Sequence, residues 1–255
     1  MNEALKPYFE LRGKQVNEVL HASERTGLLT EAMAYQLAGL RYRIARTADP
    51  DVSSFRFVQA NFPGDFCHFN CMREVAREGE GVCMTHTRRC RAEDFSWPGK
   101  RRPNADMAGV SCRGFSTAHK SRMTKGAFAH SDSDLFESWV AGIKKDEPDF
   151  AVMENVLGMS IQTSKEDEAP LRRIVEFIER ELPQYSCVVI WTDAIVWLVL
   201  NRKRLWIHLV HKRAGGRAAQ DRFIALLKAR KDSYDYVYGR CGRYIRYGRY
   251  RRYTL

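Results

Sequence analysis

Short apolar strands and amphipathic helices alternate along the second half of this chain. Apolar segments typical of buried strands run from Ala105 to Val110, Phe150 to Met153, Ser186 to Trp191 and Leu205 to Val210. Helical spacing of apolar residues predicts one helix that ends near Lys145 and another from Leu171 to Leu182. Alternation of this kind predicts an α/β fold, with a Rossmann-like, mostly parallel sheet covered by helices.

The first 46 residues have a different pattern. Apolar residues recur at helical spacing from Leu5 to Leu20 and from Leu28 to Leu40, which predicts a helical extension packed on the core. The segment Thr47 to Asp51 breaks this pattern, and Phe55 to Val58 is expected to be the first strand. We therefore predict three parts: a helical extension at 1–46, the α/β domain at 47–215, and a basic helix and tail at 216–255.

Composition limits the class of protein. At 255 residues and 44% hydrophobic content, the chain can bury one sizeable core. No stretch reaches the roughly 18 apolar residues of a membrane span, and the N-terminus lacks the pattern of a secretory signal. The seven cysteines are an odd number with no secretory context, so we expect reduced thiols and no disulfide framework. These features predict an intracellular protein without a membrane partner.

Positive charge collects at the C-terminal end. Residues 201–255 hold 16 Lys plus Arg against 3 Asp, although the whole chain carries a net charge of only +11. Four arginines are each followed by tyrosine, at Arg243, Arg246, Arg249 and Arg252. Interleaved arginine and tyrosine can neutralise phosphates and stack on bases, so we expect DNA, or alternatively RNA, as partner. The competing interpretations are a basic tail that only keeps the protein soluble, or a terminus without a dedicated role.

Three motifs follow one another at the predicted strand ends. The first is Gly-Val-Ser-Cys-Arg-Gly-Phe-Ser, from Gly109 to Ser116, and Met-Glu-Asn-Val at 153–156 places Glu154 42 residues after Cys112 (154 − 112). The third, Asn-Arg-Lys-Arg-Leu-Trp at 201–206, opens the last predicted strand. Carboxyl ends of parallel strands share one edge of a sheet, where ligands bind, so Cys112 and Glu154 are expected to meet there. Taken alone, a cysteine is more often an inert core residue, and Glu154 a helix cap.

In order and spacing these motifs resemble the cytosine-5 DNA methyltransferase family, whose members carry Pro-Cys-Gln-Gly-Phe-Ser, Glu-Asn-Val and Gln-x-Arg-x-Arg. The resemblance covers roughly the middle 110 residues of the chain, and its motifs run from Gly109 to Trp206. It implies methyl transfer from S-adenosylmethionine to carbon 5 of cytosine in DNA, through a covalent cysteine adduct. It also implies a nuclear location or another DNA-containing compartment.

The resemblance assigns a role to each matching residue. Cys112 is implied to be the nucleophile that adds to carbon 6 of an extruded cytosine, a step that suits a polarizable thiolate. Glu154 is implied to hold ring nitrogen 3 protonated, and Arg202 and Arg204 to contact the carbonyl oxygen of the base. Asn155 is implied to support that loop, and Asn155 and Asp94 are the candidate residues on the cofactor side.

The chain departs from the family pattern at several positions. Ser111 replaces the family's proline and Arg113 its glutamine, which removes a fixed torsion and adds a charge beside the thiol. The glycine-rich cofactor loop is expected between Phe55 and Cys67, yet this segment contains only Gly64. The 51 residues after Arg204 (255 − 204) are too few for the family's target-recognition region and final element. A protein partner that completes the cofactor pocket is one explanation.

Two other functions are consistent with the sequence. The chain can be a catalytically silent relative that binds nucleic acid through its basic end. It can also be a zinc-containing interaction module, since six thiol and imidazole side chains lie close in sequence: Cys67, His68, Cys71, Cys83, His86 and Cys90. Their spacing does not match paired Cys-x-x-Cys motifs, so no metal is expected and the thiols are predicted to be buried or free.

Overall fold

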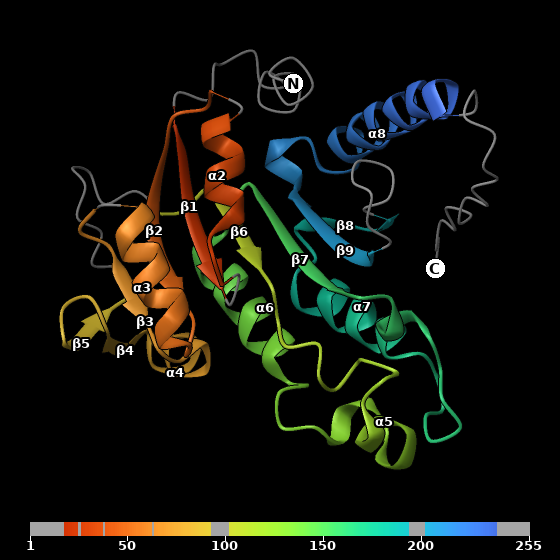
Figure 1. Ribbon diagram of the computed structural model, residues 1–255, viewed down its shortest axis with the longest axis horizontal. Coiled ribbons are helices and arrows are strands. Elements are labelled where there is room, and N and C mark those ends of the chain that lie inside the picture. Colours follow the sequence, from red (N-terminus) through yellow and green to blue (C-terminus); the bar gives the residue numbers. More distant parts are fainter. Residues whose placement is uncertain are drawn as a thin grey trace.

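The computed structural model describes residues 18–24, 27–37, 39–62, 64–92, 102–193 and 202–238. The strands are β1 (Val19–Glu24), β2 (Tyr42–Ala48), β3 (Cys67–Phe69), β4 (Glu80–Cys83), β5 (Arg88–Arg91), β6 (Ala105–Ala108), β7 (Phe150–Val156), β8 (Tyr185–Asp193) and β9 (Lys203–His211). The helices are α2 (Thr30–Leu37), α3 (Val52–Asn61), α4 (Met72–Glu78), α5 (Lys120–Lys125), α6 (Leu135–Asp146), α7 (Pro170–Glu181) and α8 (Gly216–Tyr238). Figure 1 shows their arrangement.

All nine strands form one mixed sheet, in the order β5-β4-β3-β2-β1-β6-β7-β9-β8. Its five central strands, β3-β2-β1-β6-β7, pair in parallel. Antiparallel strands extend both edges, with the β4–β5 hairpin beside β3 and the β9–β8 pair beside β7. The predicted α/β class and mostly parallel core are confirmed.

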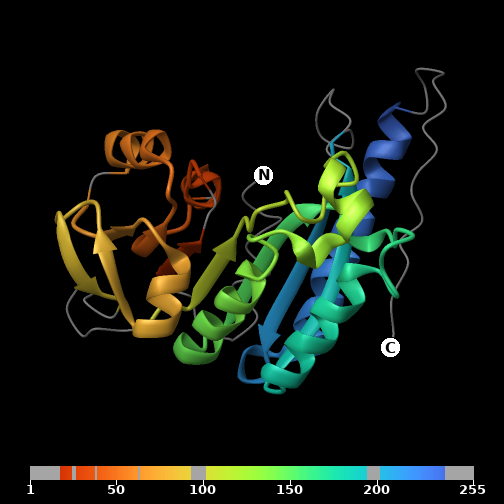
Figure 2. The same cartoon turned by 90° about the horizontal axis from the view of Figure 1, so that it is seen from below.

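Helices cover the two faces of this sheet (Figure 2). The face under α4, α6 and α7 contains the larger core, in which Phe69, Trp139 and Ile174 are almost completely buried. The opposite face contains a smaller core between α2, α3 and the sheet, built around Leu29, Ile44 and Val58. Farther along that second face, α8 packs on β8 and β9.

The prediction of a helical extension at 1–46 is wrong for most of its described residues. Only α2 is helical, whereas β1 and β2 are strands near the centre of the sheet. All six residues of β1 are buried. The polar residues His21, Ser23 and Glu24 are buried together with the apolar ones, so the segment lacks the continuous apolar run that is typical of a strand buried on both faces. The predicted boundary at 46/47 falls inside β2.

The strand predicted at Phe55 to Val58 is also wrong. These residues lie within α3, whose N-cap Asp51 accepts a hydrogen bond from the backbone N–H of Ser53. The cap satisfies an amide of the first turn and starts the helix there. The predicted elements from residue 105 to 211 do form, with bounds that differ by a few residues. The division of the remaining chain into 47–215 and 216–255 stays a prediction.

Two expectations from composition concern the described residues. None of the helices in this part of the chain is long and apolar enough to span a membrane. The six cysteines in it, Cys67, Cys71, Cys83, Cys90, Cys112 and Cys187, are free thiols.

Candidate active site

Among the parallel strands of the sheet, the chain order reverses between β1 and β6. From β1 the chain continues through β2 and β3 on one side, and from β6 it continues through β7 on the other. In open α/β sheets, ligands bind in the crevice beyond the carboxyl ends of the strands at such a point. Cys112 follows β6, and Glu154 lies close to the carboxyl end of β7. The fold thus brings both predicted residues to this edge.

The loop after β6 forms a tight turn with Cys112 on its outside. The carbonyl of Cys112 accepts hydrogen bonds from the backbone N–H groups of Phe115 (3.0 Å) and Ser116 (2.8 Å). Phe115 is 1% exposed and anchors the turn in the core, whereas Cys112 is exposed. An apolar anchor and a closed turn therefore present an accessible thiol at the edge of the sheet.

Asn155 connects this loop to β7. Its side chain is fully buried, and Nδ2 donates to the carbonyl of Val110 at 3.2 Å. Its Oδ1 accepts from the backbone N–H of Val156 at 2.8 Å. Asn155 thus fixes the chain two residues before Cys112. The expected cofactor contact of Asn155 stays a prediction.

Arg122, which the sequence analysis did not single out, holds the other side of the loop. Its guanidinium is buried and donates to the backbone carbonyls of Phe115, Gly158 and Ile161. It also pairs with Glu166 at 3.2 Å, with side-chain exposures of 0% and 7%. Burial raises the pKa of Glu166, but hydrogen bonds from Arg122 and from backbone amides outweigh it and lower that pKa. No local motif in the sequence marks this arginine, because its partners lie up to 44 residues away.

Two glycines allow the loops to approach closely. A Cβ atom at Gly114 would overlap the Ser133 hydroxyl and lie 2.8 Å from the Ala127 carbonyl oxygen. A Cβ atom at Gly158 would overlap the carbonyl oxygen of Phe115. Since backbone atoms cannot move aside as a flexible side chain does, both positions exclude larger residues.

Glu154 and Arg204 form an ion pair across β7 and β9. Arg204 Nε lies 2.5 Å from Glu154 Oε1, and the two side chains are 23% and 30% exposed. Burial raises the pKa of Glu154, and the positive charges of Arg204 and Arg202 oppose that rise without cancelling it. Arg202 is exposed, and its backbone N–H donates to Asp193 at 3.0 Å. The predicted carboxyl and arginine residues therefore form one electrostatic group, with Arg204 in contact and Arg202 farther out.

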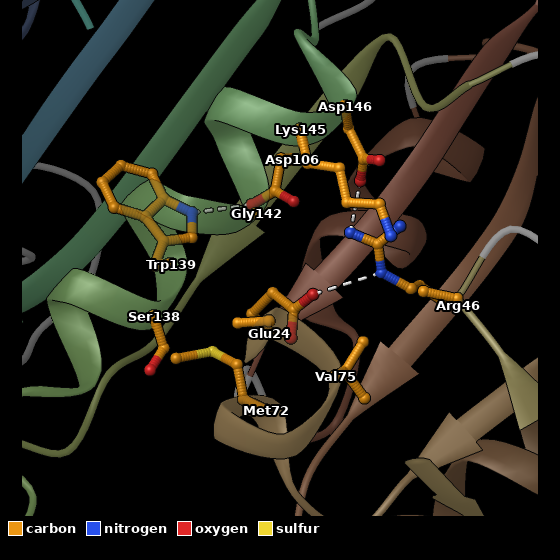
Figure 3. A pocket seen from close by; sticks show the side chains of 12 residues that line it. Glu24, Arg46, Met72, Val75, Asp106, Ser138, Trp139, Gly142, Lys145 and Asp146 are labelled. Atoms are coloured by element: carbon orange, nitrogen blue, oxygen red, sulfur yellow. Dashed lines mark hydrogen bonds and ion pairs between the residues drawn. The ribbon is translucent and has the colours of Figure 1, made fainter. Parts of the chain in front are cut away.

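A cluster of buried charges lies between the strands β1, β2 and β6 and the helices α4 and α6 (Figure 3). Arg46 pairs with Asp146 at 2.5 Å and with Glu24 at 3.4 Å, and Asp106 accepts from Trp139 Nε1 at 2.7 Å. They surround a cavity of about 20 Å³. Burial raises the pKa values of Glu24 and Asp106 to about 7. The backbone carbonyl of Glu24 accepts a hydrogen bond from the backbone N–H of Gly109. This bond joins β1 to the start of the Cys112 loop.

The topology corrects the expected position of the cofactor loop. The segment Phe55 to Cys67 begins inside α3 and ends in β3, so it is not the loop after the first strand. That loop follows β1 and contains Gly27, whose φ of 67° is a conformation that favours glycine. Asp49 follows β2, 22 residues after Gly27 (49 − 27), and accepts the backbone N–H of Asp51. An acidic residue at this spacing binds ribose hydroxyls in dinucleotide-binding sheets, so Gly27 and Asp49 fit an adenosine group.

Five predicted residues lie outside the described part of the chain. They are the candidate cofactor residue Asp94 and the four candidate nucleic-acid-binding arginines Arg243, Arg246, Arg249 and Arg252. Their assignments stay predictions.

Part of the chain is similar to known DNA methylases, and its fold is similar to that of solved methyltransferases. Residues 101–212 match the model of the C-5 cytosine-specific DNA methylases. The structure is similar to a prophage-encoded E. coli protein described as a DNA modification methyltransferase, with a TM-score of 0.53 and 16% identity over 76% of this chain and 47% of that one. It is also similar to the S. pombe Dnmt2 methyltransferase, with a TM-score of 0.50 and 13% identity over 76% of this chain and 50% of that one.

Because both sequence identities are low, these similarities show a shared fold alone. The chain spans about half the length of the two solved structures. No curated protein matches it.

Proposed function

We propose that the chain transfers a methyl group to carbon 5 of cytosine in DNA, because residues 101–212 match the model of the C-5 cytosine-specific DNA methylases. The observation that carries the proposal is the position of two groups at one sheet edge. The exposed Cys112 thiol follows β6, and the Glu154–Arg204 pair lies at the end of the neighbouring β7. The methyltransferase fold of the two structural neighbours supports the same reaction.

In the proposed reaction, Cys112 acts as the nucleophile. Its thiolate adds to carbon 6 of the cytosine, and the electron density moves to carbon 5, which takes the methyl group. Loss of the proton from carbon 5 then releases Cys112 as a thiolate. A base inside a duplex is out of reach of the thiol, so the target base has to be rotated out of the helix.

Glu154 and the arginines are proposed to act on the opposite side of the ring. Burial raises the pKa of Glu154, which favours the protonated carboxyl that can donate to ring nitrogen 3. Arg204, which contacts Glu154 directly, and the more exposed Arg202 are proposed to contact the carbonyl oxygen of the base. This arrangement withdraws electrons from the ring while the thiolate adds.

S-adenosylmethionine is the proposed methyl donor, and it supplies an electrophilic methyl group. Gly27 and Asp49 at the ends of β1 and β2 are the described residues that would hold its adenosine part. Asp94 is a further candidate by sequence alone. DNA is the proposed substrate, with RNA as the other polyanion that fits the basic C-terminal end, and a DNA-containing compartment is the proposed location.

A trapping experiment tests this proposal. The full chain is incubated with S-adenosylmethionine and a duplex that carries 5-fluorocytosine, because a fluorine at carbon 5 cannot leave as a proton does. We expect a covalent protein–DNA adduct that survives denaturation and is absent from C112S and C112A. C71S, at a half-buried cysteine outside the site, serves as the cysteine control, and an adduct that persists in C112A would reject Cys112 as the nucleophile.

One observation favours a second function, that of a catalytically silent nucleic-acid-binding relative. The loop between β1 and α2 contains only Gly27, where the family has a glycine-rich loop. Calorimetry with S-adenosylmethionine, with and without duplex DNA, separates the two functions. Saturable binding supports the enzyme. Absence of binding under both conditions supports the silent relative, or an enzyme that needs a partner protein to complete its pocket.

A further inference from the structure

Three cysteines and one histidine converge at the edge of the sheet away from Cys112. Cys67 lies in β3, Cys83 at the end of β4 and Cys90 in β5, while His86 lies in the turn between β4 and β5. Their ligand atoms all lie within 4.8 Å of one another. The cysteines are buried, and His86 closes the group from the outer side.

The distances within this group have the size of a tetrahedral metal site. His86 Nδ1 lies 3.5 Å from Cys67 Sγ, 3.3 Å from Cys83 Sγ and 3.4 Å from Cys90 Sγ. Zinc bonds of about 2.3 Å to sulfur and about 2.0–2.1 Å to nitrogen, at tetrahedral angles, hold nitrogen and sulfur about 3.6 Å apart. The three sulfurs thus surround one imidazole nitrogen at almost equal distances, close to that separation.

A carboxylate orients the imidazole from behind. Asp65 Oδ1 lies 2.7 Å from His86 Nε2. A hydrogen bond from Nε2–H to this carboxylate leaves the lone pair of Nδ1 directed at the sulfurs. Metal-binding histidines carry such a carboxylate partner on their second nitrogen. This contact is independent of the sulfur distances, and it indicates a ligand at the same point.

The structure also selects among the six candidates in the sequence. His68, although adjacent to Cys67, contacts Thr47 Oγ1 at 2.6 Å and the carbonyl of Asp49 at 3.2 Å. Cys71 is the N-cap residue of α4 and is not part of the group. The remaining ligands read Cys67, then Cys83-x2-His86-x3-Cys90, with the last three on one hairpin.

We propose that Cys67, Cys83, His86 and Cys90 bind one Zn²⁺ ion with a structural role. Three thiolates and an imidazole form a closed tetrahedral set with no position left for substrate, which distinguishes structural from catalytic zinc. The prediction of no metal is thereby replaced. The β-ladder between β3 and β4 consists of a single residue pair, Phe69 with Cys83, so the ion would strengthen the junction of the β4–β5 hairpin with the sheet.

Metal analysis of the purified full chain tests the proposal. We expect one zinc per chain, measured by inductively coupled plasma mass spectrometry. C83S and C90S should lose the zinc, whereas C71S, which changes a cysteine of the same segment outside the group, should retain it. Zinc-free wild-type protein from a zinc-supplemented culture would overturn the site, as would equal zinc content in wild type, C83S and C90S.

A second measurement covers ligand variants that fail to fold. D65N keeps all four ligands, and we expect it to lower zinc affinity about 10- to 100-fold in competition with a chromogenic chelator. The exposed D167N is the matched control. Co²⁺ exchanged into wild-type protein should give the visible bands of tetrahedral cobalt and a thiolate charge-transfer band. Octahedral cobalt spectra, unchanged affinity in D65N, or a disulfide within the group would each contradict the proposal.

Discussion

A single buried amide positions the candidate nucleophile. Asn155 donates to the Val110 carbonyl, two residues before Cys112, and has no exposed surface. We expect N155A to leave this carbonyl unpaired and to lower the free energy of unfolding by about 1–3 kcal/mol. Adduct formation on 5-fluorocytosine DNA should slow in parallel, because the thiol is no longer held in place.

Urea unfolding and the adduct rate measure the two effects of N155A. N61A is the matched control, since Asn61 donates to the Phe57 carbonyl on an exposed surface and should change stability by less than about 0.5 kcal/mol. If N155A were destabilised but formed adduct at the wild-type rate, a positioning role for Asn155 would be excluded.

The Cys112 loop also requires the close approach of the Phe115 carbonyl to the backbone of Gly158. An alanine Cβ there would overlap the Phe115 carbonyl, so we expect G158A to displace the Cys112 loop and to cost about 1–3 kcal/mol. G142A is the matched control, because nothing lies within 4 Å of a Cβ at Gly142 in α6. Alanine should stabilise that helix by up to about 1 kcal/mol. Thermal unfolding should show a lower melting temperature for G158A and an unchanged or higher one for G142A. Equal changes in melting temperature would contradict the proposed contact.

Local motifs made part of the site predictable. Cys112, Glu154 and Arg204 were found because each stands in a short, ordered motif next to a strand end, and the parallel topology brings strand ends together. Arg122 and the zinc ligands depend on contacts between distant segments. Cys67 and Cys83 lie on different strands, and no fixed spacing predicts that they meet. Such residues become visible only when the register of the sheet is known.

At the scale of elements, Arg122 joins α5, the Cys112 loop and the segment after β7. R122M would keep much of the side-chain volume but leave Glu166 and three backbone carbonyls without their cation. Breaking a buried pair in this way costs about 3–5 kcal/mol. Urea unfolding should show this loss, whereas R172M, at a 61% exposed position, should change stability by less than about 0.5 kcal/mol. Similar values for both variants would show that Arg122 is not a structural link.

The wrong elements share a physical cause. The sequence does not mark β1 and β2 as central strands because buried polar residues, such as His21 in β1 and Arg46 in β2, interrupt the apolar runs expected there. In contrast, β7 and β9 were predicted correctly because the helices α6 and α7 around them have clear apolar stripes and defined ends. Misplacing the first strand also misplaced the cofactor loop, which is why Gly27 and Asp49 were not singled out. The order of the strands, and not the composition, decides which glycine lies in the loop after the first strand.

At the scale of the whole molecule, the buried carboxyls of Glu24 and Asp106 couple stability to pH. The pKa values of Glu24 and Asp106 rise from ordinary values near 4 to about 7 through burial, with Arg46 opposing the rise. A carboxyl whose pKa is higher in the folded state binds more protons there, so its stabilising contribution is present at low pH and is lost as pH rises through about 7. His208 acts in the opposite sense, since burial lowers its pKa to about 4.

A variant isolates the carboxyl contribution from that of His208. D106N is neutral at every pH, and its Oδ1 can still accept from Trp139. We expect the free energy of unfolding of D106N minus that of wild type to increase from pH 5 to pH 8, because only wild type pays for ionising a buried carboxyl. The exposed E176Q should show a constant difference over this range. A D106N difference that is flat or decreases with pH would mean that Asp106 is ionised in the folded protein at pH 5, and that the charges around Arg46 are balanced differently.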